Sequence, residues 1–399
     1  MAETFEHARN LILAKVAPLE AEKIDLFEAV DRCLAAEIYA PYDLPLWDNS
    51  AMDGYALRAA DALEGTVLPI ITTLAAGANP AGVEIKPGTA VRILTGAPTP
   101  AGCELVIPYE ETAELDNQQV KILKTQVSGA HIRYQGEDIR GGSLVLGVGV
   151  MLRPIEINLL AALGQTHVMV YRRPKVAILS TGDELVEPGM IPGPGQIVNS
   201  NGLALSAAVR QAGAVPILLG IARDQPASLK AKLSEGLKNA DLLITSAGVS
   251  AGDRDYVRQV LAELGIEQIF WKVDVKPGRP TAFGLRGTTP VFSLPGNPVS
   301  ALLTFEEFVR PALRKMQGDK QILRPLRLAR LTSDIRKKAG RTNLLRVILV
   351  DQQGQLTATS AGDQNTGITS TLLHANGLAI LPAEKDFFAA GEQVEVHDI

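Results

Sequence analysis

The sequence predicts a multidomain α/β plus β protein whose centre is a three-layer α/β domain with a mostly parallel sheet. Two patterns lead to this prediction. Between about residues 173 and 320, short apolar strand patterns alternate with amphipathic helix patterns, as they do in βαβ units. Before and after this segment, short apolar runs are separated by glycine and proline without long helices between them, which is typical of β domains.

The part of the chain before residue 173 combines helical and β patterns. Apolar residues recur at spacings of three and four in residues 3–17, and a second short helical pattern follows at about residues 26–38. Short apolar runs between residues 66 and 150 predict an all-β insert. The run EINLLAALG then predicts a helix that stops at Gly164.

The central segment alternates regularly between strand and helix. The strand patterns are KVAILS, VPILLGI, DLLITS, QIFWKVDV and VFSLPG, and Gly213 stands where the first helix would stop. After residue 320, short strand patterns without long helices predict a small C-terminal β-barrel. The expected domains are a helical and linker domain (1–45 and 140–172), an inserted β-rich domain (46–139), an α/β domain (173–320) and a C-terminal β domain (321–399).

Composition argues against several classes of function. The net charge of -5 disfavours nucleic-acid binding, which needs a basic surface. Cys33 and Cys103 lie far apart and lack metal-ligand spacing, so we expect buried thiols in a cytoplasmic protein. The N-terminus lacks the pattern of a signal peptide, and no apolar run is long enough to span a membrane.

The stretch WDNSAMDGYA, residues 47–56, places two acids, Asp48 and Asp53, among small residues. Its pattern fits neither a helix face nor a strand. For Asp48 and Asn49 we expect local hydrogen bonds to the backbone of a turn. Asp53 lies outside the α/β segment, so a functional role would require that it reach a site built by another domain.

Polar loops follow the expected strands of the α/β segment. Because ligands bind outside the carboxyl ends of the strands in open parallel sheets, we expect these loops to share one edge. The loops are STGDELVEPG, the Arg223–Asp224 pair, SAGVSAGDRDY, KPGRP and PGNPVS. For most of these loops taken singly, an ordinary turn is the better explanation, but five at one edge indicate a binding site.

The residue types in these loops suit a phosphorylated ligand. Glycines let backbone N–H groups approach phosphate oxygens, and helix N-termini add partial positive charge. Ser246, Gly248 and Ser250 are candidates for a phosphate cradle. In PGNPVS, Asn297 can also cap the helix that Pro298 begins, and the two roles are compatible.

Charged residues of the same loops suit a metal ion and an oxyanion. Asp224 and Asp255 supply the carboxylates that Mg²⁺ prefers beside substrate phosphates. Lys272, Lys276 and Arg279 supply positive charge for an oxyanion, and Gly278 with two prolines fixes their segment. A solvated basic strand end is the alternative interpretation of these cations.

Other common site chemistries are poorly supported. The sequence contains no G-x-x-x-x-G-K-[ST] and no G-x-G-x-x-G at a first strand–helix turn, which disfavours a P-loop and a Rossmann dinucleotide site. It has no G-x-S-x-G, and none of its five histidines lies in a strand-end loop, which disfavours a Ser/His/Asp hydrolase.

Seven motifs occur in one order along the chain: DNSAMDGYA, RILTGAPTP, GEDI, STGDEL, SAGVSAGDRDY, KPGRP and SLPGNPVSALLTF. Together they resemble the molybdopterin molybdenumtransferase family, which includes the E domain of gephyrin. The resemblance extends from about Phe5 to the C-terminus. The central domain also resembles molybdopterin adenylyltransferase, which would make residues 173–320 the molybdopterin-binding domain.

The resemblance implies a reaction and an assembly. Members of the family bind adenylylated molybdopterin, molybdate and Mg²⁺, cleave the pyrophosphate link, release AMP and leave molybdenum on the dithiolene. The family fold implies an elongated homodimer of four-domain subunits, with an active site between the α/β domain of one subunit and the β-rich domain of the other. Transient contact with molybdopterin adenylyltransferase is expected, and contact with nucleic acid or membrane is not.

The family's functional residues are carried over onto matching positions. The implied catalytic residues are Asp53, Thr95, Asp138, Glu184, Asp224, Asp255, Lys272 and Lys276, and Asp224 and Asp255 are the implied metal ligands. The implied substrate-binding residues are Ser246, Gly248, Gly252, Gly278, Arg279, Pro295, Gly296, Asn297, Ser300, Arg346 and Thr366. The oxyanion site would draw on Lys276, Ser300, Arg346 and Thr366, although DQNTGITS departs from the family's shorter Gln-Gly-Ser loop, and Arg279 stands where many members have lysine.

Two other functions stay open at the level of sequence. A protein that only carries the adenylylated pterin would need the same binding loops without turnover. A nucleotide pyrophosphatase would explain the loops of residues 173–320, but it would leave DNSAMDGYA and the C-terminal β domain without a role.

Overall fold

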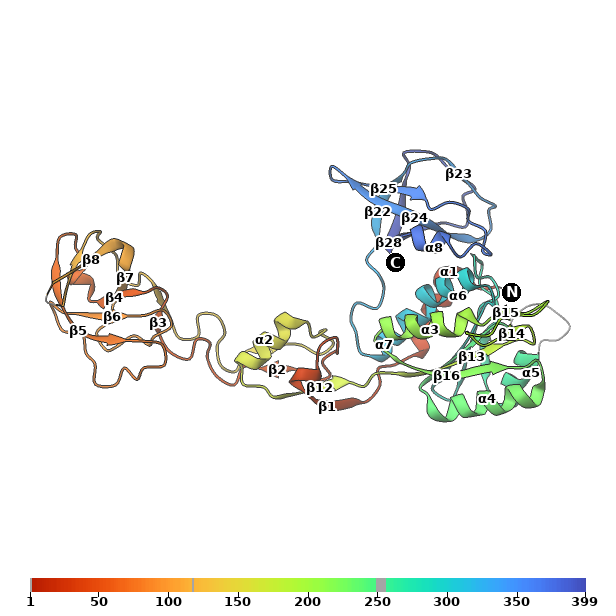
Figure 1. Cartoon of the computed structure of the whole chain (residues 1–399), viewed down its shortest axis with the longest axis horizontal. Helices are drawn as coiled ribbons and strands as arrows, with labels where there is room; N and C mark the ends of the chain where they lie inside the picture. The colour runs from red at the N-terminus through yellow and green to blue at the C-terminus, as the bar shows by residue number, and fades with distance from the viewer. Residues whose placement is uncertain (1, 117, 249–255) are drawn as a thin grey trace. The chain divides into compact units, whose positions relative to one another are not determined.

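The computed structural model describes residues 2–116, 118–248 and 256–399 (Figure 1). The chain forms two compact units. The first comprises residues 1–36, 148–158 and 166–399, and the second comprises residues 37–147 and 159–165. Among the described residues, no helix is long and apolar enough to cross a bilayer.

The first unit is built around a six-stranded sheet. In spatial order its strands are β16 (Val215–Ala222), β13 (Lys175–Thr181), β17 (Leu242–Ser246), β21 (Thr289–Leu294), β20 (Ala282–Arg286) and β18 (Glu267–Phe270). The first four are parallel, whereas β20 and β18 each run antiparallel to their neighbours. The mostly parallel sheet that the sequence predicts is therefore confirmed.

Helices cover both faces of this sheet and make it a three-layer domain (Figure 1). Val176 and Ile178 of β13 pack in one apolar cluster, and Ala177 and Leu179 pack in the other. Successive side chains of a strand point to opposite faces, so the uninterrupted apolar run of β13 serves a sheet that is buried on both sides. The helices of the first cluster are α1 (Phe5–Lys15), α3 (Ser200–Gln211), α6 (Pro298–Thr304), the π-helical turn Phe305–Val309 and α7 (Arg310–Met316), and those of the second are α4 (Pro226–Asn239) and α5 (Tyr256–Glu263).

The C-terminal part of the first unit is a closed five-stranded barrel. Around the ring its strands are β24 (Thr342–Gln352), β25 (Gln355–Ser360), β22 (Arg327–Leu331), β28 (Gln393–Asp398) and β26 (Gly377–Leu381). The ring closes because β24 pairs with both β25 and β26, so the expected barrel is confirmed. Smaller elements accompany it, namely β23 (Ile335–Arg336), β27 (Phe387–Phe388) and α8 (Thr371–His374).

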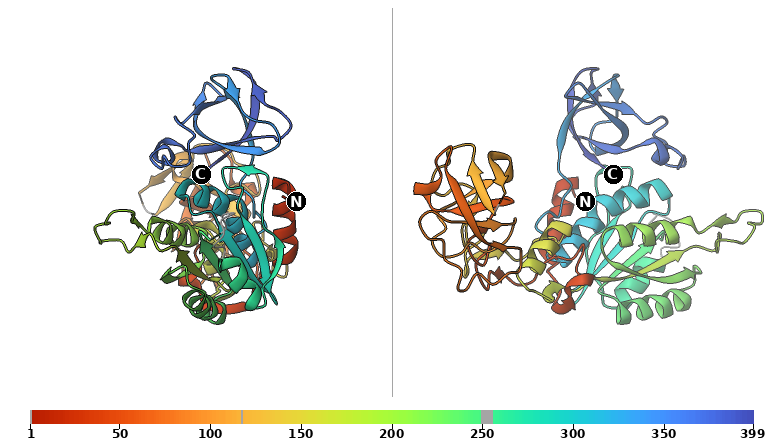
Figure 2. Two further views of the ribbon diagram at one scale, coloured as in Figure 1. Left: turned by 90° about the vertical axis from the view of Figure 1, so that its right-hand side faces the viewer. Right: turned by 60° about the vertical axis from the view of Figure 1, so that its left-hand side comes forward.

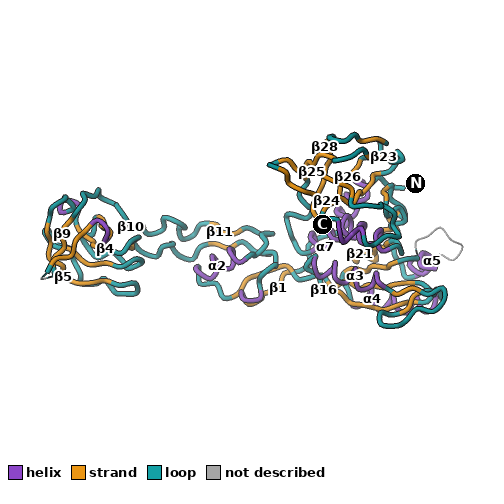
Figure 3. Tube along the Cα trace, turned by 45° about the horizontal axis from the view of Figure 1, so that its top comes forward, coloured by secondary structure: helices purple, strands orange, loops and turns teal. Residues whose placement is uncertain are grey.

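The second unit consists mainly of strands and loops (Figure 3). Its largest sheet contains, in spatial order, β7 (Leu105–Pro108), β4 (Gly54–Leu57), β6 (Ala90–Ile93), β5 (Val67–Leu74), β9 (Gln119–Ile122) and β8 (Thr112–Leu115). Two short ladders pair β3 (Asn49–Ser50) with β10 (Ile132–Arg133), and β2 (Ile38–Tyr39) with β11 (Leu144–Leu146). Asp53 lies in the turn between β3 and β4.

Two short ladders complete the first unit. β1 (Ala21–Asp25) pairs with β12 (His167–Tyr171), and β14 (Leu185–Val186) pairs with β15 (Ile197–Val198). Figure 2 shows the segment between β14 and β15 as an arm that extends away from the central sheet. The helix α2 (Pro154–Ala162) ends shortly before Gly164, whose φ of 73° is the left-handed conformation expected at a helix stop.

The helix expected at residues 26–38 is wrong. The segment forms only a three-residue 3₁₀ turn, Leu26–Glu28, in which the Asp25 carboxylate accepts a hydrogen bond from the Phe27 N–H. Asp31 has a φ of 60°, which interrupts an α-helix. Phe27 is 88% exposed, although Leu26, Ala29 and Leu34 of the same segment are buried, so the spacing of apolar residues does not define a helix here.

The single strand expected at QIFWKVDV is also wrong. Its first half is β18 of the central sheet, whereas Val275–Lys276 form β19, which pairs with β24 of the barrel. The chain leaves the sheet because Asp274 donates its N–H to the carbonyl of Glu3, and the Glu3 N–H bonds the carbonyl of Lys272. The KPGRP loop therefore follows a barrel-associated strand, and not all five polar loops share the edge of the central sheet.

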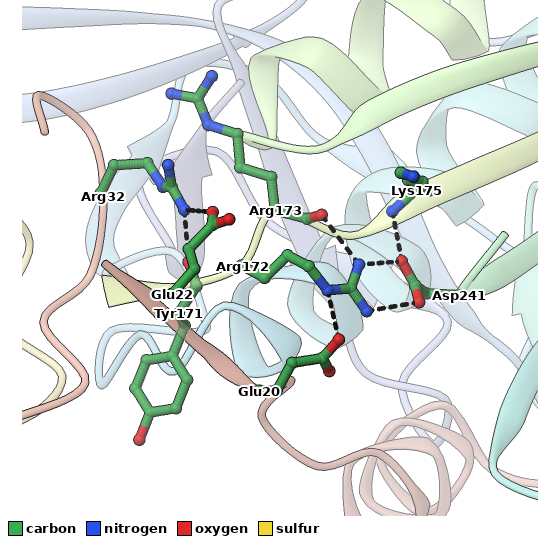
Figure 4. Close-up of polar contacts among 8 residues, drawn as sticks. All are labelled: Glu20, Glu22, Arg32, Tyr171, Arg172, Arg173, Lys175 and Asp241. Carbon is green, nitrogen blue, oxygen red and sulfur yellow. Dashed lines mark hydrogen bonds and ion pairs between the residues drawn. The ribbon is translucent and has the colours of Figure 1, made fainter. Parts of the chain in front are cut away.

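The amino ends of β13 and β17 are joined by a partly buried ion pair (Figure 4). The Arg172 guanidinium bonds both carboxylate oxygens of Asp241 at 2.6 and 2.8 Å, and the Lys175 N–H bonds the same carboxylate at 2.8 Å. Burial raises the pKa of Asp241, but the hydrogen bonds from Arg172 and Lys175 outweigh it and hold that pKa below its usual range. Arg172 also bonds Glu20 at 2.7 Å.

We predict that Arg172→Leu lowers the free energy of unfolding by about 3 kcal/mol, because it leaves the Asp241 carboxylate partly buried without its partner. Glu20→Gln, the control, should have a smaller effect because Glu20 is exposed. Since the folded pKa of Asp241 is depressed, its stabilisation is present above the unfolded pKa of about 4 and is lost as pH falls through the folded value. Denaturant unfolding at pH 7 and at acid pH should show a difference between wild type and Arg172→Leu that narrows in acid. A difference that stays constant with pH would contradict this role.

Candidate functional site

A cavity of about 380 Å³ lies at the carboxyl edge of the central sheet, and we call it the sheet-edge cavity. Its walls come from the ends of β13 and β17, the loop after β21, β15 and the first residues of α3 and α6. Ligands of open α/β sheets bind at this edge. Four residues implied by the family resemblance line the cavity, namely Glu184, Ser246, Gly296 and Asn297.

Strand register places the loops of this cavity side by side. Ser180 of β13 is the register partner of Ser246 of β17, and Ser246 is the partner of Leu294 of β21. The loops that follow approach closely, since a Cβ atom on Gly296 would lie 3.0 Å from the Cβ of Ala247. Ala247 has a φ of 74°, a strained conformation for a residue with a side chain, and such strain is concentrated at functional sites.

Asn201, at the start of α3, joins two of these loops. Its Nδ2 atom donates hydrogen bonds of 2.8 Å to Ser246 Oγ and to the carbonyl oxygen of Gly296. Its Oδ1 atom is buried and has no hydrogen-bond partner in the described part of the chain. Sequence reasoning missed Asn201, although the NSN motif directly before a helix pattern was an available N-cap signal.

The side-chain cap expected from Asn297 is absent. Asn297 occupies the N-cap position of α6, but its side chain makes no capping bond, and its buried Oδ1 has no partner among residues 2–116, 118–248 and 256–399. Asn199 does cap α3, because its Oδ1 accepts bonds from the Gly202 N–H at 3.1 Å and from Ser180 Oγ at 2.8 Å. The amide of Asn297 lines the sheet-edge cavity instead.

Glu184 depends on a neighbouring glycine for its position. Gly182 has a φ of 146°, and a Cβ atom there would lie 2.4 Å from Oε2 of Glu184. The carboxylate therefore lies against backbone that only glycine leaves uncovered. Gly248 has a similar constraint, since its φ is 76° and a Cβ would lie 2.2 Å from Cγ2 of Val257 on α5.

Two acidic residues from neighbouring loops come together near this edge. The Asp224 N–H donates a hydrogen bond of 3.2 Å to Oδ1 of Asp183, and Arg223 Nη1 bonds the Asp183 carbonyl at 2.8 Å. Asp255 and Gly252, which the resemblance also implies, lie outside the described residues. Within the described ranges, no group of three His, Cys, Asp or Glu side chains is placed to hold a metal ion.

A second cavity, of about 240 Å³, lies beside the barrel, and we call it the barrel cavity. It brings together two residues that the resemblance assigns to the oxyanion site, Lys276 and Thr366. Arg336 and Lys337 add positive charge to its wall, and Asp334 adds one carboxylate. Lys276 is exposed and has no hydrogen-bond or ion-pair partner among the described residues, so its ammonium group is available to an anion.

The other residues near KPGRP have different surroundings. Gly278 packs against α6, since its φ is 109° and a Cβ would lie 2.2 Å from Cγ2 of Thr304. Arg279 lies 3.6 Å from Asp274, and both side chains are partly exposed. Lys272 is exposed, and it lines neither cavity.

Arg346, on β24, is the largest fully buried side chain of the described residues. Its Nη2 atom donates to the carbonyls of Asp363 at 2.9 Å and Asn365 at 3.4 Å. Its Nε and Nη1 atoms have no hydrogen-bond partner within the described structure. Burial lowers the pKa of this guanidinium. Buried unpaired donors of a cation are costly, so they indicate that an anion belongs nearby.

Two further residues implied by the resemblance are buried beside these cavities. Ser300 lies on α6 and is buried, and it lines neither cavity. Pro295 is buried directly after β21 and leads into Gly296. The structure thus groups Lys276 with Thr366, whereas Ser300 and Arg346 are buried and line neither cavity.

In the second unit, Asp53 and Thr95 are in direct contact. Oδ1 of Asp53 accepts hydrogen bonds from the Thr95 N–H at 2.7 Å and from Thr95 Oγ1 at 2.9 Å. The bond from the Thr95 backbone, followed by the bond from its hydroxyl, lowers the pKa of Asp53. Both residues are exposed, so the carboxylate is accessible to a ligand or to another chain.

The remaining acids of this unit have structural neighbours. Asp138 is exposed, and its backbone N–H bonds the Leu44 carbonyl at 3.1 Å. Asp48 accepts a hydrogen bond of 2.7 Å from the N–H of Gln135. The local bond expected for Asn49 is present, from its Nδ2 to the Trp47 carbonyl at 3.1 Å. Within the described residues, the Asp48 side chain bonds the distant Gln135 and not its own turn, so the local bond expected for Asp48 is wrong.

Comparison with known proteins identifies the class of protein that this fold and site define. Three family models match in succession: the MoeA N-terminal region (domain I and II) at residues 3–164, the "Probable molybdopterin binding domain" at residues 177–315, and the MoeA C-terminal region (domain IV) at residues 328–399. The α/β domain with the sheet-edge cavity is the part that matches the molybdopterin-binding model.

Full-length relatives agree with these matches. A molybdopterin molybdenumtransferase from Haemophilus influenzae is 37% identical over 98% of this chain and 98% of its own length, and one from a Nostoc species is 38% identical over 97% and 91%. The crystal structure of the molybdopterin biosynthesis MoeA protein from Pyrococcus horikoshii OT3 aligns over the whole of both chains with a TM-score of 0.85 and 30% identity. The chain therefore belongs to the molybdopterin molybdenumtransferase family, and it is a transferase of molybdenum cofactor biosynthesis.

We predict that Thr95→Val raises the pKa of Asp53, because it removes the hydroxyl donor and keeps the backbone donor. Thr95→Ser, which retains both donors, should leave that pKa close to its wild-type value. The titration of the Asp53 carboxyl carbon, followed by NMR, measures the change. An unchanged pKa in Thr95→Val would show that the hydroxyl does not hold the carboxylate in solution.

Proposed function

We propose that this enzyme inserts molybdenum from molybdate into the dithiolene of adenylylated molybdopterin, with Mg²⁺-dependent cleavage of the pyrophosphate bond and release of AMP. The observation that carries the proposal is the sheet-edge cavity, in which the loops after three parallel strands are joined through Asn201. The names of its full-length relatives support the same activity.

Phosphates of the substrate would bind at the loops of this cavity. The strained backbone at Ala247 and the start of the twelve-residue helix α3 are suited to present N–H groups to phosphate oxygens. The unpartnered Oδ1 atoms of Asn201 and Asn297 would accept hydrogen bonds from donors on the substrate. Glu184, fixed against Gly182, would act at the same wall.

The acidic loops are suited to hold Mg²⁺. Asp224 is in contact with Asp183, and both supply hard oxygen ligands. We propose Asp224 as a ligand together with Asp255. A divalent cation there would neutralise charge on the phosphates as the pyrophosphate bond breaks. The protein would place the carboxylates that hold the cation and would bind the phosphates of the substrate.

Molybdate would bind at the barrel cavity. Lys276 offers an ammonium group that no described residue pairs with, and Thr366 offers a hydroxyl in the lining of the same cavity. Arg346 contributes the field of a fully buried guanidinium with two unpartnered nitrogen atoms. Such a site concentrates the oxyanion near the reacting sulfur atoms, so that proximity can replace a very high affinity.

The second unit would contribute to catalysis from another subunit. Asp53, Thr95 and Asp138 lie on this unit, and the family resemblance assigns them to the active site. We therefore propose a cytoplasmic homodimer in which each site combines the α/β domain of one subunit with the β-rich unit of the other. Molybdopterin adenylyltransferase would deliver the substrate through transient contact.

We predict that Asp224→Asn lowers the rate of AMP release at least a hundredfold, because it removes one negative charge from the metal site. Since the substitution changes little volume, the affinity for the adenylylated pterin should stay within about threefold of wild type. AMP release under single-turnover conditions and equilibrium binding test this. Arg223→Lys, which preserves charge beside the loop, serves as the control. AMP release at the wild-type rate from Asp224→Asn would refute the metal role.

We predict that mixed dimers of Asp53→Ala and Asp224→Asn chains recover activity that neither variant has alone. In a mixed dimer, one of the two sites would receive neither substitution. Differently tagged chains can be co-purified and assayed for AMP release, and up to half of the wild-type activity per dimer is expected. Mixed dimers that release no AMP, or a wild-type protein that is monomeric at the assay concentration, would contradict an active site shared between two subunits.

A further inference from the structure

The loop after β25 is fastened to β24 by one side chain, that of Gln364. The β24–β25 ladder ends at the pair Val347 and Ser360. The next residue of β24, Arg346, still needs partners for its backbone. Its N–H donates to Oε1 of Gln364 at 3.0 Å, and its carbonyl accepts from Nε2 of Gln364 at 3.1 Å. The primary amide of Gln364 thus continues the ladder where β25 has ended.

Gln364 also makes contacts within its own loop. Its Nε2 atom lies within hydrogen-bond distance of Ser360 Oγ at 3.2 Å and of the Gly362 carbonyl at 3.2 Å. The Ala361 N–H adds a bond of 3.0 Å to the same Arg346 carbonyl. One half-buried amide therefore connects the end of β25, the loop and β24.

The loop that Gln364 holds to β24 determines the surroundings of two groups in the proposed oxyanion site, the Arg346 guanidinium and the Thr366 hydroxyl. Its carbonyls at Asp363 and Asn365 accept hydrogen bonds from Nη2 of Arg346, whereas Nε and Nη1 have no partner in the described part of the chain. Two residues beyond Gln364, Thr366 forms part of the wall of the barrel cavity. Lys276, which lines the same cavity, is the register partner of Asn343 on the same strand β24. β24 therefore fixes Lys276 through Asn343 and Thr366 through Gln364.

We infer that Gln364 is a positioning residue of the oxyanion site, which holds the Thr366 loop against β24 so that Thr366, Lys276 and the Arg346 guanidinium keep one arrangement. The inference rests on the proposed binding of molybdate at the barrel cavity. A side chain in this role must donate and accept at once, and it must be long enough to reach the backbone of the neighbouring strand. Among the standard amino acids, glutamine meets all three requirements without adding a charge beside Arg346.

Gln364→Met tests the inference, because methionine preserves length and volume and removes both hydrogen bonds. We expect its KM for molybdate to rise about tenfold, while its KM for adenylylated molybdopterin stays within twofold, since the phosphate loops belong to the other cavity. Gln364→Glu keeps the acceptor for the Arg346 N–H and loses the donor to its carbonyl, so an intermediate rise is expected. A general loss of structure in the variant would raise the KM values for both substrates, and not the KM for molybdate alone.

Gln352→Met is the matched control, because Gln352 is an exposed residue of the same strand that pairs with Gln355 on β25. The thermal midpoints of all variants identify any variant that fails to fold. If Gln364→Met fails to fold, Gln364→Glu is tested in its place. Calorimetry with tungstate as the probe measures oxyanion binding without turnover. If the wild type and Gln364→Met bind tungstate with equal affinity, the positioning role of Gln364 is overturned, whereas the proposed oxyanion site is not. A wild-type protein that binds no oxyanion would overturn the proposed site, and the inference with it.

Discussion

The parallel register of β13, β17 and β21 is the constraint on which the substrate site depends. At the amino ends, the bidentate pair of Arg172 and Asp241 fixes β17 beside β13. At the carboxyl ends, the same register brings Ser180, Ser246 and Leu294 level, so that three loops begin at one edge. A shift of one residue would turn every apolar side chain of these strands to the wrong face, and both cores hold the register against such a shift.

The barrel strand β24 has the corresponding role in the proposed oxyanion site. Along a few residues it pairs with Lys276, carries the buried Arg346 and holds the Thr366 loop through Gln364. Its other neighbours close the barrel, so these contacts rest on a rigid element. Buried guanidinium nitrogen atoms without partners are expensive for a folded protein. Their presence beside a basic cavity is accounted for if an anion binds there during the reaction.

Much of this arrangement could be predicted from the sequence. Uninterrupted apolar runs such as KVAIL define strands that are buried on both faces, and the loops after them identify the edge at which Glu184, Ser246 and Asn297 meet. Long-range pairing could not be predicted. The bonds of Glu3 to residues 272 and 274, which lie where the chain passes from the central sheet to the strand β19 beside the barrel, have no local signal. Neither does the contact of Thr95 with Asp53, because the two residues lie 42 positions apart. Apolar spacing misled at residues 26–38, where Phe27 is exposed and Asp31 is left-handed.

The central claim is that cleavage of the pyrophosphate bond is coupled to the binding of an oxyanion at a separate, basic cavity. The most direct measurement is AMP release from adenylylated molybdopterin by the purified wild-type protein, as molybdate, tungstate and Mg²⁺ are varied independently. The account predicts one AMP released for each molybdopterin metallated, with saturable dependence on molybdate and an absolute requirement for a divalent cation. AMP release at the same rate without any oxyanion would contradict the account and would indicate a nucleotide pyrophosphatase. Tight binding of the pterin without AMP release under any condition would indicate a carrier.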